Sequence, residues 1–190
     1  MLRFIRLLMI SVIFICSFST WVMAAEYKID PTHSFVEFRI QHLGYSWLYG
    51  RFNDVKGDFL YDDNKVSESR FTVEISTGSV DTNHAERDKH IRSADFLDVG
   101  KFPQSTFTTK FFKGDKTGGI LTGDLTLHGV TKEIKINVKK IGEGTDPWDG
   151  YRAGFFGTTK INRKDFGINY DLGPASDMME FDLSIEGVRK

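Results

Sequence analysis

Histidine and acidic side chains alternate along one short segment, and their spacing could hold a divalent cation. His84 and Asp88 are four residues apart, as are Glu86 and His90. Residues four apart share one face of a helix, so each pair could supply two ligands. A solvated helical face with mixed charges gives the same pattern, and neither a cysteine nor a third histidine is close by. We therefore predict no metal and no cofactor.

Two arginines and another histidine form a second candidate group, suited to an anion. A guanidinium binds a phosphate through two parallel hydrogen bonds. Arg87, Arg92 and His42 are therefore candidate contacts for the charged head group of a ligand. The arginines could instead form ordinary surface salt bridges. His42 follows Ile40 in the same phase, so it could also be a hydrogen-bonded histidine at the rim of a sheet.

Signatures of catalysis are missing from the sequence. It contains no nucleophile elbow, no glycine-rich phosphate loop and no zinc-protease helix. Ser93 lies close to Asp95, but the sequence shows no base positioned for it. We predict that the protein is not an enzyme. Because triads assemble from distant positions, a lipid-modifying enzyme stays an alternative.

Apolar residues at every second position dominate the rest of the chain, which has 17 phenylalanines. Such an alternation places apolar side chains on one face of a β-strand and polar ones in water. We predict the following inward-facing, ligand-binding set: Val36, Phe38, Ile40, Phe52, Phe59, Phe71, Val73, Ile75, Phe107, Leu125, Leu127, Ile136, Val138, Phe155, Phe181, Leu183 and Ile185. A set of this kind either fills the core of a small barrel or surrounds a cavity in it.

Turn-forming residues divide the chain into strand-sized pieces. The predicted strands lie near residues 33–41, 50–61, 69–77, 104–112, 118–128, 131–141, 150–162 and 177–188, with a short pairing segment at 27–29. Many short antiparallel strands with few helices predict an all-β barrel of about eight strands.

Four local features interrupt or join these strands. The aromatic segment 42–48 lacks period two and is predicted as a short helical turn. A change of phase between Phe52 and Val55 predicts a β-bulge. Gly129 supplies the turn of the clearest hairpin. Residues 81–96 are predicted as one substantial side helix, with its first or second residue as the N-cap.

The N-terminal residues indicate export. Arg3 and Arg6 precede an apolar stretch of about a dozen residues, which is too short for a membrane span, and Ala24 ends a small-residue cleavage pattern. We predict a signal peptide over 1–24 and no membrane-spanning segment. Removing the two arginines leaves 23 basic against 26 acidic residues, so nucleic acid is not an expected partner. The only cysteine, Cys16, would leave with the signal.

Several motifs in order resemble the YceI-like family, in particular its enterobacterial-type members. They are HSFVEFRIQH at 33–42, SVDTNHAERDKHIRSADFL at 79–97, KFP at 101–103 and GDLTLHGVT at 123–131. The resemblance covers nearly all of 25–190 and implies one domain with a lipocalin-like antiparallel barrel of eight strands. It further implies a periplasmic protein that binds a polyisoprenoid, or a similar long amphiphile, inside the barrel without catalytic residues.

Three functions compete at this point. The first is binding or carriage of a long apolar amphiphile, such as a polyisoprenoid or quinone, driven by the removal of its tail from water. The second is modification of such a lipid. The third is a packed interaction domain with no internal ligand. The sequence also leaves a homodimer open, because exposed strand edges could pair two chains.

Overall fold

The structure is a computed structural model and describes residues 24–190. The predicted signal peptide lies outside the described residues apart from Ala24. In the described part, no helix has the length and apolar character needed to cross a membrane.

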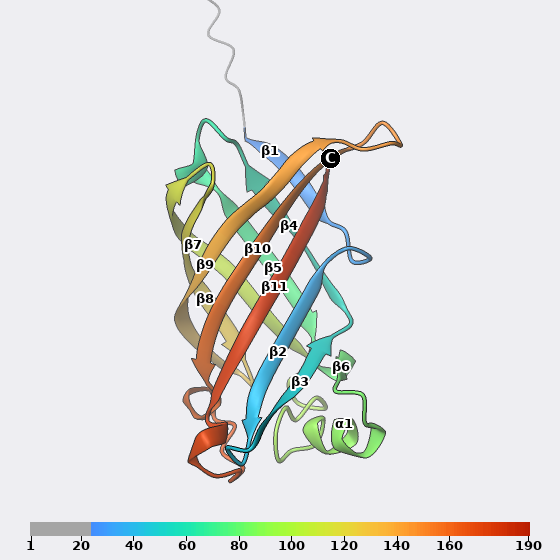
Figure 1. Cartoon of the computed structure of the whole chain (residues 1–190), viewed down its shortest axis with the longest axis vertical. Coiled ribbons are helices and arrows are strands. Elements are labelled where there is room, and N and C mark those ends of the chain that lie inside the picture. Colours follow the sequence, from blue (N-terminus) through green and yellow to red (C-terminus); the bar gives the residue numbers. More distant parts are fainter. Residues whose placement is uncertain (1–23) are drawn as a thin grey trace, which may run out of the picture.

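Eight antiparallel strands close into a barrel, which confirms the predicted fold class (Figure 1). Their order around the barrel is β1, β4, β5, β7, β8, β9, β10 and β11, and pairing of β1 with β11 completes the circle. Three further strands, β2, β3 and β6, extend the sheet from β11. The bounds are β1 Ala25–Ile29, β2 Phe35–His42, β3 Ser46–Phe52, β4 Val55–Tyr61, β5 Arg70–Ser76, β6 Val80–Asp81, β7 Gln104–Asp115, β8 Gly118–Leu127, β9 Val130–Thr145, β10 Tyr151–Asn162 and β11 Met178–Arg189.

The alternating pattern orients the strands as predicted. On β5, Phe71 and Val73 are buried while Arg70 and Thr72 are exposed. Val73 pairs with Phe107 on β7, so apolar residues of neighbouring strands meet on the inner face. The predicted hairpin turn is also confirmed. His128 and Gly129 both have positive φ and join Leu127 directly to its partner Val130.

The chain breaks between β3 and β4, and this corrects the predicted strand 50–61. β3 ends at Phe52 and β4 begins at Val55, so the chain has a strand break where we predicted a bulge. The backbone NH of Asn53 donates to the carbonyl of Ser79 at 3.1 Å, and that of Ser76 donates to Asp54 at 3.0 Å. These two bonds satisfy backbone groups of Asn53 and Asp54, which lie between the two strands.

Residues 42–48 form a β-hairpin, so the predicted helical turn is wrong. His42 pairs with Ser46, and the amide of Tyr45 donates to the carbonyl of His42 at 2.9 Å. Leu43 and Gly44 both have positive φ, at 53° and 81°. This is the geometry of a tight hairpin turn, and Leu43 is an uncommon residue for it.

The predicted side helix is present but shorter than predicted. Helix α1 spans Ala85–Ile91, and its N-cap is His84. The ring of His84 accepts from the amide of Arg87 at 3.2 Å. Asp81 is instead the last residue of β6. Figure 1 shows α1 beside the end of the barrel that lies away from the C-terminus, and we call this the helix end.

Candidate functional site

The barrel interior contains an apolar chamber of about 140 Å³, which we call the upper chamber. Fourteen residues of the predicted inward set line it: Val36, Phe52, Phe71, Val73, Ile75, Phe107, Leu125, Leu127, Ile136, Val138, Phe155, Phe181, Leu183 and Ile185. The chamber is therefore surrounded by side chains from most of the strands. The barrel is hollow at this level rather than fully packed.

A second apolar chamber of about 440 Å³ lies at the helix end, and we call it the lower chamber. Phe38 and Ile40, also members of the predicted set, line it together with Leu48, Ile91 and Leu172. Four residues line both chambers, namely Phe52, Leu97, Ile168 and Met179. The two chambers therefore adjoin, and we call them together the cavity.

Sequence reasoning missed three of the four residues at this junction. Met179 precedes Phe181 and Leu183 at period two, so the strand pattern could have identified it. Leu97 and Ile168 are buried residues of connecting segments. No periodicity marks such positions, and only the tertiary fold brings them to the cavity.

The barrel end opposite α1 is closed by aromatic packing. Phe59 stacks on Tyr27 and on Phe71, with ring centroids 4.8 Å and 5.0 Å apart. Phe155 meets Phe59 and Tyr61 edge to face, at 5.5 Å and 4.9 Å. Phe59 is the one residue of the predicted set that lines neither chamber. It instead helps to seal what we call the closed end.

A polar cluster covers this seal. The hydroxyl of Tyr61 donates to Asp63 at 2.5 Å, and the Lys140 ammonium lies 2.6 Å from the same carboxylate. Burial raises the pKa of Tyr61, and the bond to Asp63 adds to this. The hydrogen bond from Lys140 lowers the pKa of Asp63. The closed end therefore carries a fixed ion pair above its aromatic layer.

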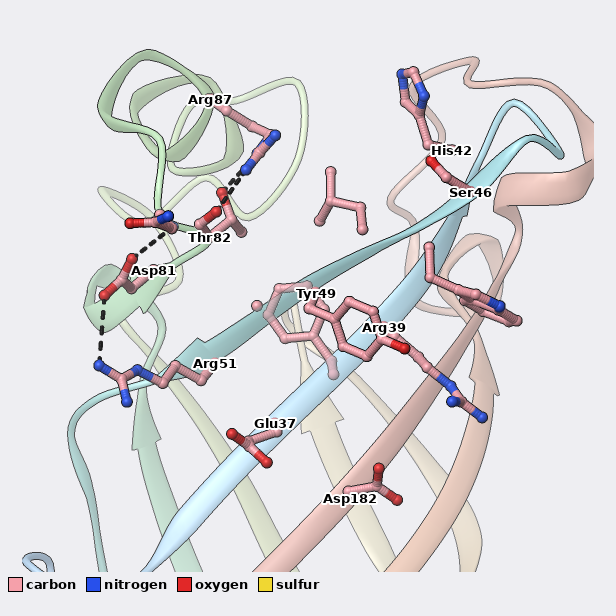
Figure 2. Close-up of a pocket in the computed structure, with 15 residues that line it drawn as sticks. Glu37, Arg39, His42, Ser46, Tyr49, Arg51, Asp81, Thr82, Arg87 and Asp182 are labelled. Atoms are coloured by element: carbon pink, nitrogen blue, oxygen red, sulfur yellow. Dashed lines mark hydrogen bonds and ion pairs between the residues drawn. The ribbon is translucent and has the colours of Figure 1, made fainter.

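The helix end is where the cavity reaches the surface. A groove on the outer face of β2 and β3 shares Phe38, His42, Leu48 and Arg87 with the lower chamber. In Figure 2, Arg87 and His42 lie on opposite sides of this groove. Two of the three predicted head-group residues are therefore placed at the mouth of the cavity.

Arg87 is held in place by the segment before its helix. Its Nε donates to Thr82 Oγ1 at 2.7 Å, and its Nη2 donates to the Thr82 carbonyl at 2.5 Å (Figure 2). Thr82 is fixed in turn by the buried carboxylate of Asp88, which accepts from its hydroxyl at 2.5 Å. Arg92 lines neither chamber. It donates to the carbonyls of Gly78 and Val80, so its position is structural and gives its predicted head-group role no support.

Arg163 forms part of the wall of the lower chamber and is almost fully buried. Its guanidinium donates to the carbonyls of Ser176 and Ile168 at 2.9 Å and 2.7 Å, and to Asp177 at 3.2 Å. These bonds fasten the connection between β10 and β11 against the cavity. The charge is compensated by Asp177, as a buried cation requires.

Three of the four side chains with metal-like spacing, His84, Asp88 and His90, are engaged in other interactions. Asp88 accepts from Thr82, and His84 caps the helix. His90 Nε2 lies 2.8 Å from Asp95. His84 and Asp88 are thus each committed to a different partner, as is His90.

One other cluster in residues 24–190 brings three potential ligand atoms within 4.8 Å of one another, from Asp30, His33 and Glu186. Arg152 already donates to Asp30 at 2.7 Å and to Glu186 at 2.6 Å. Hydrogen bonds from Thr32, His33 and Arg152 lower the pKa of Asp30. The guanidinium thus supplies the positive charge that these carboxylates need.

The residues nearest to a catalytic triad are not arranged as one. Ser93 Oγ donates to the backbone carbonyl of His90 at 2.7 Å. The His90 ring pairs with Asp95 and packs on Phe96 and Tyr170, with centroids 5.0 Å and 5.3 Å away. Nucleophilic catalysis needs the hydroxyl on the imidazole. This cluster instead joins two connecting segments across the helix end.

Comparison with known proteins identifies the family. A sequence model of the YceI-like domain matches residues 27–187. The chain belongs to the YceI-like family. It is 56% identical to the protein YceI of Salmonella arizonae over 170 residues, which cover 88% of this chain and 89% of that one.

Solved structures of the family have the same fold. The crystal structure of a Campylobacter jejuni YceI protein superposes with a TM-score of 0.71 and 31% identity, covering 80% of this chain and 90% of that one. A polyisoprenoid-binding domain from Saccharophagus degradans superposes with a TM-score of 0.63 and 16% identity, covering 88% and 99%. At that identity the second likeness concerns the fold alone.

Proposed function

We propose that this YceI-like protein binds and carries a long apolar amphiphile, such as a polyisoprenoid or a quinone with a long tail, without modifying it. The observation that carries the proposal is the pair of adjoining chambers, lined by apolar side chains and open at one end. The name of the Saccharophagus domain supports this ligand class. The residues that form the signal pattern support the periplasm as its location.

Desolvation would drive the binding. Each methylene group transferred from water into the cavity contributes about 0.8 kcal/mol, and a preformed apolar cavity has little to reorganise. A polar head group would stay at the mouth, where Arg87 and His42 offer hydrogen-bond donors. The position of Ser93 supports carriage over catalysis, because its hydroxyl bonds a backbone carbonyl rather than the His90 ring.

The direct test is native mass spectrometry of the protein purified from its own host, followed by organic extraction. We expect a long apolar compound to leave with the wild type. Leu125→Asp, which places a charge in the upper chamber, should abolish it, whereas Ile120→Asp, on the exposed face of the same strand, should retain it. A compound bound equally by both variants would contradict an internal site.

A second variant covers the case in which Leu125→Asp does not fold. Leu48→Trp keeps the lower chamber apolar but reduces its volume, so we expect less bound compound and a normal circular dichroism spectrum. Prolonged incubation should leave the extracted compound unchanged. Its conversion would favour the enzyme, and wild-type protein free of any apolar compound would favour the packed interaction domain.

A further inference from the structure

The hairpin that joins β2 to β3 exposes aromatic and aliphatic side chains without any charge among them. Residues 43–50 read LGYSWLYG, in a protein of which 27% of the residues are charged. Tyr45 is 86% exposed, and Leu43 and Trp47 are exposed as well. Such residues are normally buried, and contiguous exposed apolar patches indicate contact with another phase or partner.

The hairpin is rigidly supported, so this exposure is a property of the fold. The hydroxyl of Ser176 donates to the carbonyl of Gln41 at 2.6 Å. The turn also lies close to Ala175, because a Cβ placed on Gly44 would be 3.8 Å from the Ala175 Cβ, an ordinary van der Waals distance. The turn closes its own backbone hydrogen bond from Tyr45 to His42. These contacts fix the hairpin backbone, so its exposed side chains stay at the surface.

The connection between β10 and β11 continues this surface. Tyr170 is exposed, and residues 172–176, which read LGPAS, carry no charge. Two acidic residues flank them: Asp171 accepts a hydrogen bond from the amide of Gly173 at 2.9 Å, and Asp177 pairs with Arg163 and Lys164. We define the mouth patch as Leu43, Tyr45, Trp47 and Tyr170. Leu43 and Tyr170 also line the lower chamber, so the patch is continuous with the wall of the cavity.

The loop between β9 and β10, at the other end of these strands, exposes apolar residues in a different setting. Trp148 is 75% exposed, but it lies in the sequence between Asp146 and Asp149. The Arg152 guanidinium lies 5.8 Å from its ring centroid. Trp148 therefore lies between charged residues of its own loop, whereas residues 43–50 contain none. The Trp47 ring also contacts a guanidinium, that of Arg39 at 4.7 Å, but this charge is paired with Glu180 at 2.5 Å.

The chemistry of the patch matches the interface of a neutral lipid bilayer. Tyrosine and tryptophan are enriched at the level of lipid head groups, and leucine inserts into the acyl boundary. The patch itself contains no basic residue, and the Arg39 guanidinium on Trp47 is already paired with Glu180. It therefore does not fit adsorption to an anionic surface, which depends on lysine and arginine that are free to meet lipid phosphates. We propose that the mouth patch docks the barrel on a neutral bilayer, with the helix end toward the membrane. This rests on the proposed function, because a lipid tail would then pass from the bilayer along Leu43 into the lower chamber.

Residues 25–190 contain two tryptophans, Trp47 and Trp148, and their fluorescence can report which end of the barrel meets the membrane. Trp148→Phe leaves Trp47 as the only reporter, at the mouth, and Trp47→Phe leaves Trp148. With phosphatidylcholine vesicles that carry brominated acyl chains, we expect quenching of Trp47 fluorescence and none of Trp148. Quenching of Trp148 alone, of both equally, or of neither would overturn the proposal.

A matched pair of variants tests the patch itself. Leu43→Asn combined with Tyr45→Asp removes its apolar tip, and asparagine tolerates the positive φ of position 43. We expect vesicle partitioning to weaken about tenfold or more, while Ile141→Asp, an exposed site on β9, leaves it unchanged. Binding that requires anionic lipid and disappears in about 1 M salt would mean electrostatic adsorption and would overturn docking by the patch.

The two proposals fail in different ways. An extractable ligand with no vesicle binding would refute the docking and leave the carrier. Vesicle binding without an extractable ligand would refute the carrier. A dimer in light scattering that the double variant dissociates, together with no vesicle binding, would assign the patch to a second copy of the chain and overturn the docking.

Discussion

The ring of Phe59 occupies the space where Gly187 has no side chain. A Cβ at Gly187 would stand 2.4 Å from Phe59 Cε1, well inside any normal contact. Phe59 lies at the centre of the aromatic seal, so β11 needs a glycine at this register for the closed end to pack.

Gly187→Ala should therefore destabilise the protein by about 1 to 3 kcal/mol, as is typical of an overpacked core. The measurement is the free energy of unfolding from urea denaturation. Gly142→Ala is the control, since a Cβ there would meet nothing within 4 Å. If both variants unfold at the same urea concentration as the wild type, Phe59 moves freely and the seal is not tightly packed.

Phe155 should set the length of the cavity, because it lines the upper chamber and also belongs to the seal. Phe155→Ala should lower stability by about 3 to 5 kcal/mol and shift the extracted compounds toward longer chains. Phe156→Ala, on the outward face of the same strand, should change stability by less than about 0.5 kcal/mol and leave the chain lengths unchanged. An identical mass spectrum for both variants would argue against a cavity that ends at Phe155.

Arg163 should be essential to the wall of the lower chamber. Arg163→Leu leaves the carbonyls of Ser176 and Ile168 and the carboxylate of Asp177 without this donor, at a cost of about 3 to 5 kcal/mol. Lys164→Met is the control, because the exposed Lys164 pairs with the same Asp177 at 2.9 Å. We expect thermal denaturation to show a large loss for Arg163→Leu only. Equal melting temperatures would contradict a bracing role.

The cluster around Asp30 should make stability fall in acid. Its pKa is lowered in the folded protein by hydrogen bonds from Thr32, His33 and Arg152, whereas an unfolded aspartate has a pKa of about 3.9. The ionised form therefore stabilises the fold above that value, and the contribution is lost as the pH falls below it.

Asp30→Asn should accordingly be less stable than the wild type at neutral pH, and the difference should shrink between about pH 5 and pH 2. Urea denaturation across this range measures it. Asp54→Asn, at the exposed break between β3 and β4, should leave the acid dependence of the wild type intact. A difference for Asp30→Asn that does not vary with pH would contradict the assignment.

The strand pattern carried most of the prediction, because period two is a local signal. Phe71, Val73 and Leu125 face the cavity for the same reason that their neighbours face water. The hairpin at 42–46 could not be predicted in this way. Its aromatic residues are exposed and so do not alternate with polar residues as core-facing ones do. Its turn also has Leu43 at a position where glycine or asparagine is typical.

The error in the start of the helix arises because several side chains could serve as its N-cap. Asp81 and Thr82 are both residue types that favour the N-cap position. Asp81, however, belongs to strand β6, and the Thr82 hydroxyl donates to Asp88. His84 then becomes the N-cap.

Leu97 and Ile168 reach the cavity from segments between elements, where no repeating pattern distinguishes a buried residue from an exposed one.

The aromatic seal at the closed end leaves the helix end as the side from which the cavity is reached, and under the proposed function this determines the direction in which a ligand moves. An amphiphile carried in this way would enter tail first and leave by the same opening with its head group leading. Whatever receives the cargo would therefore meet the polar group before any of the hydrocarbon.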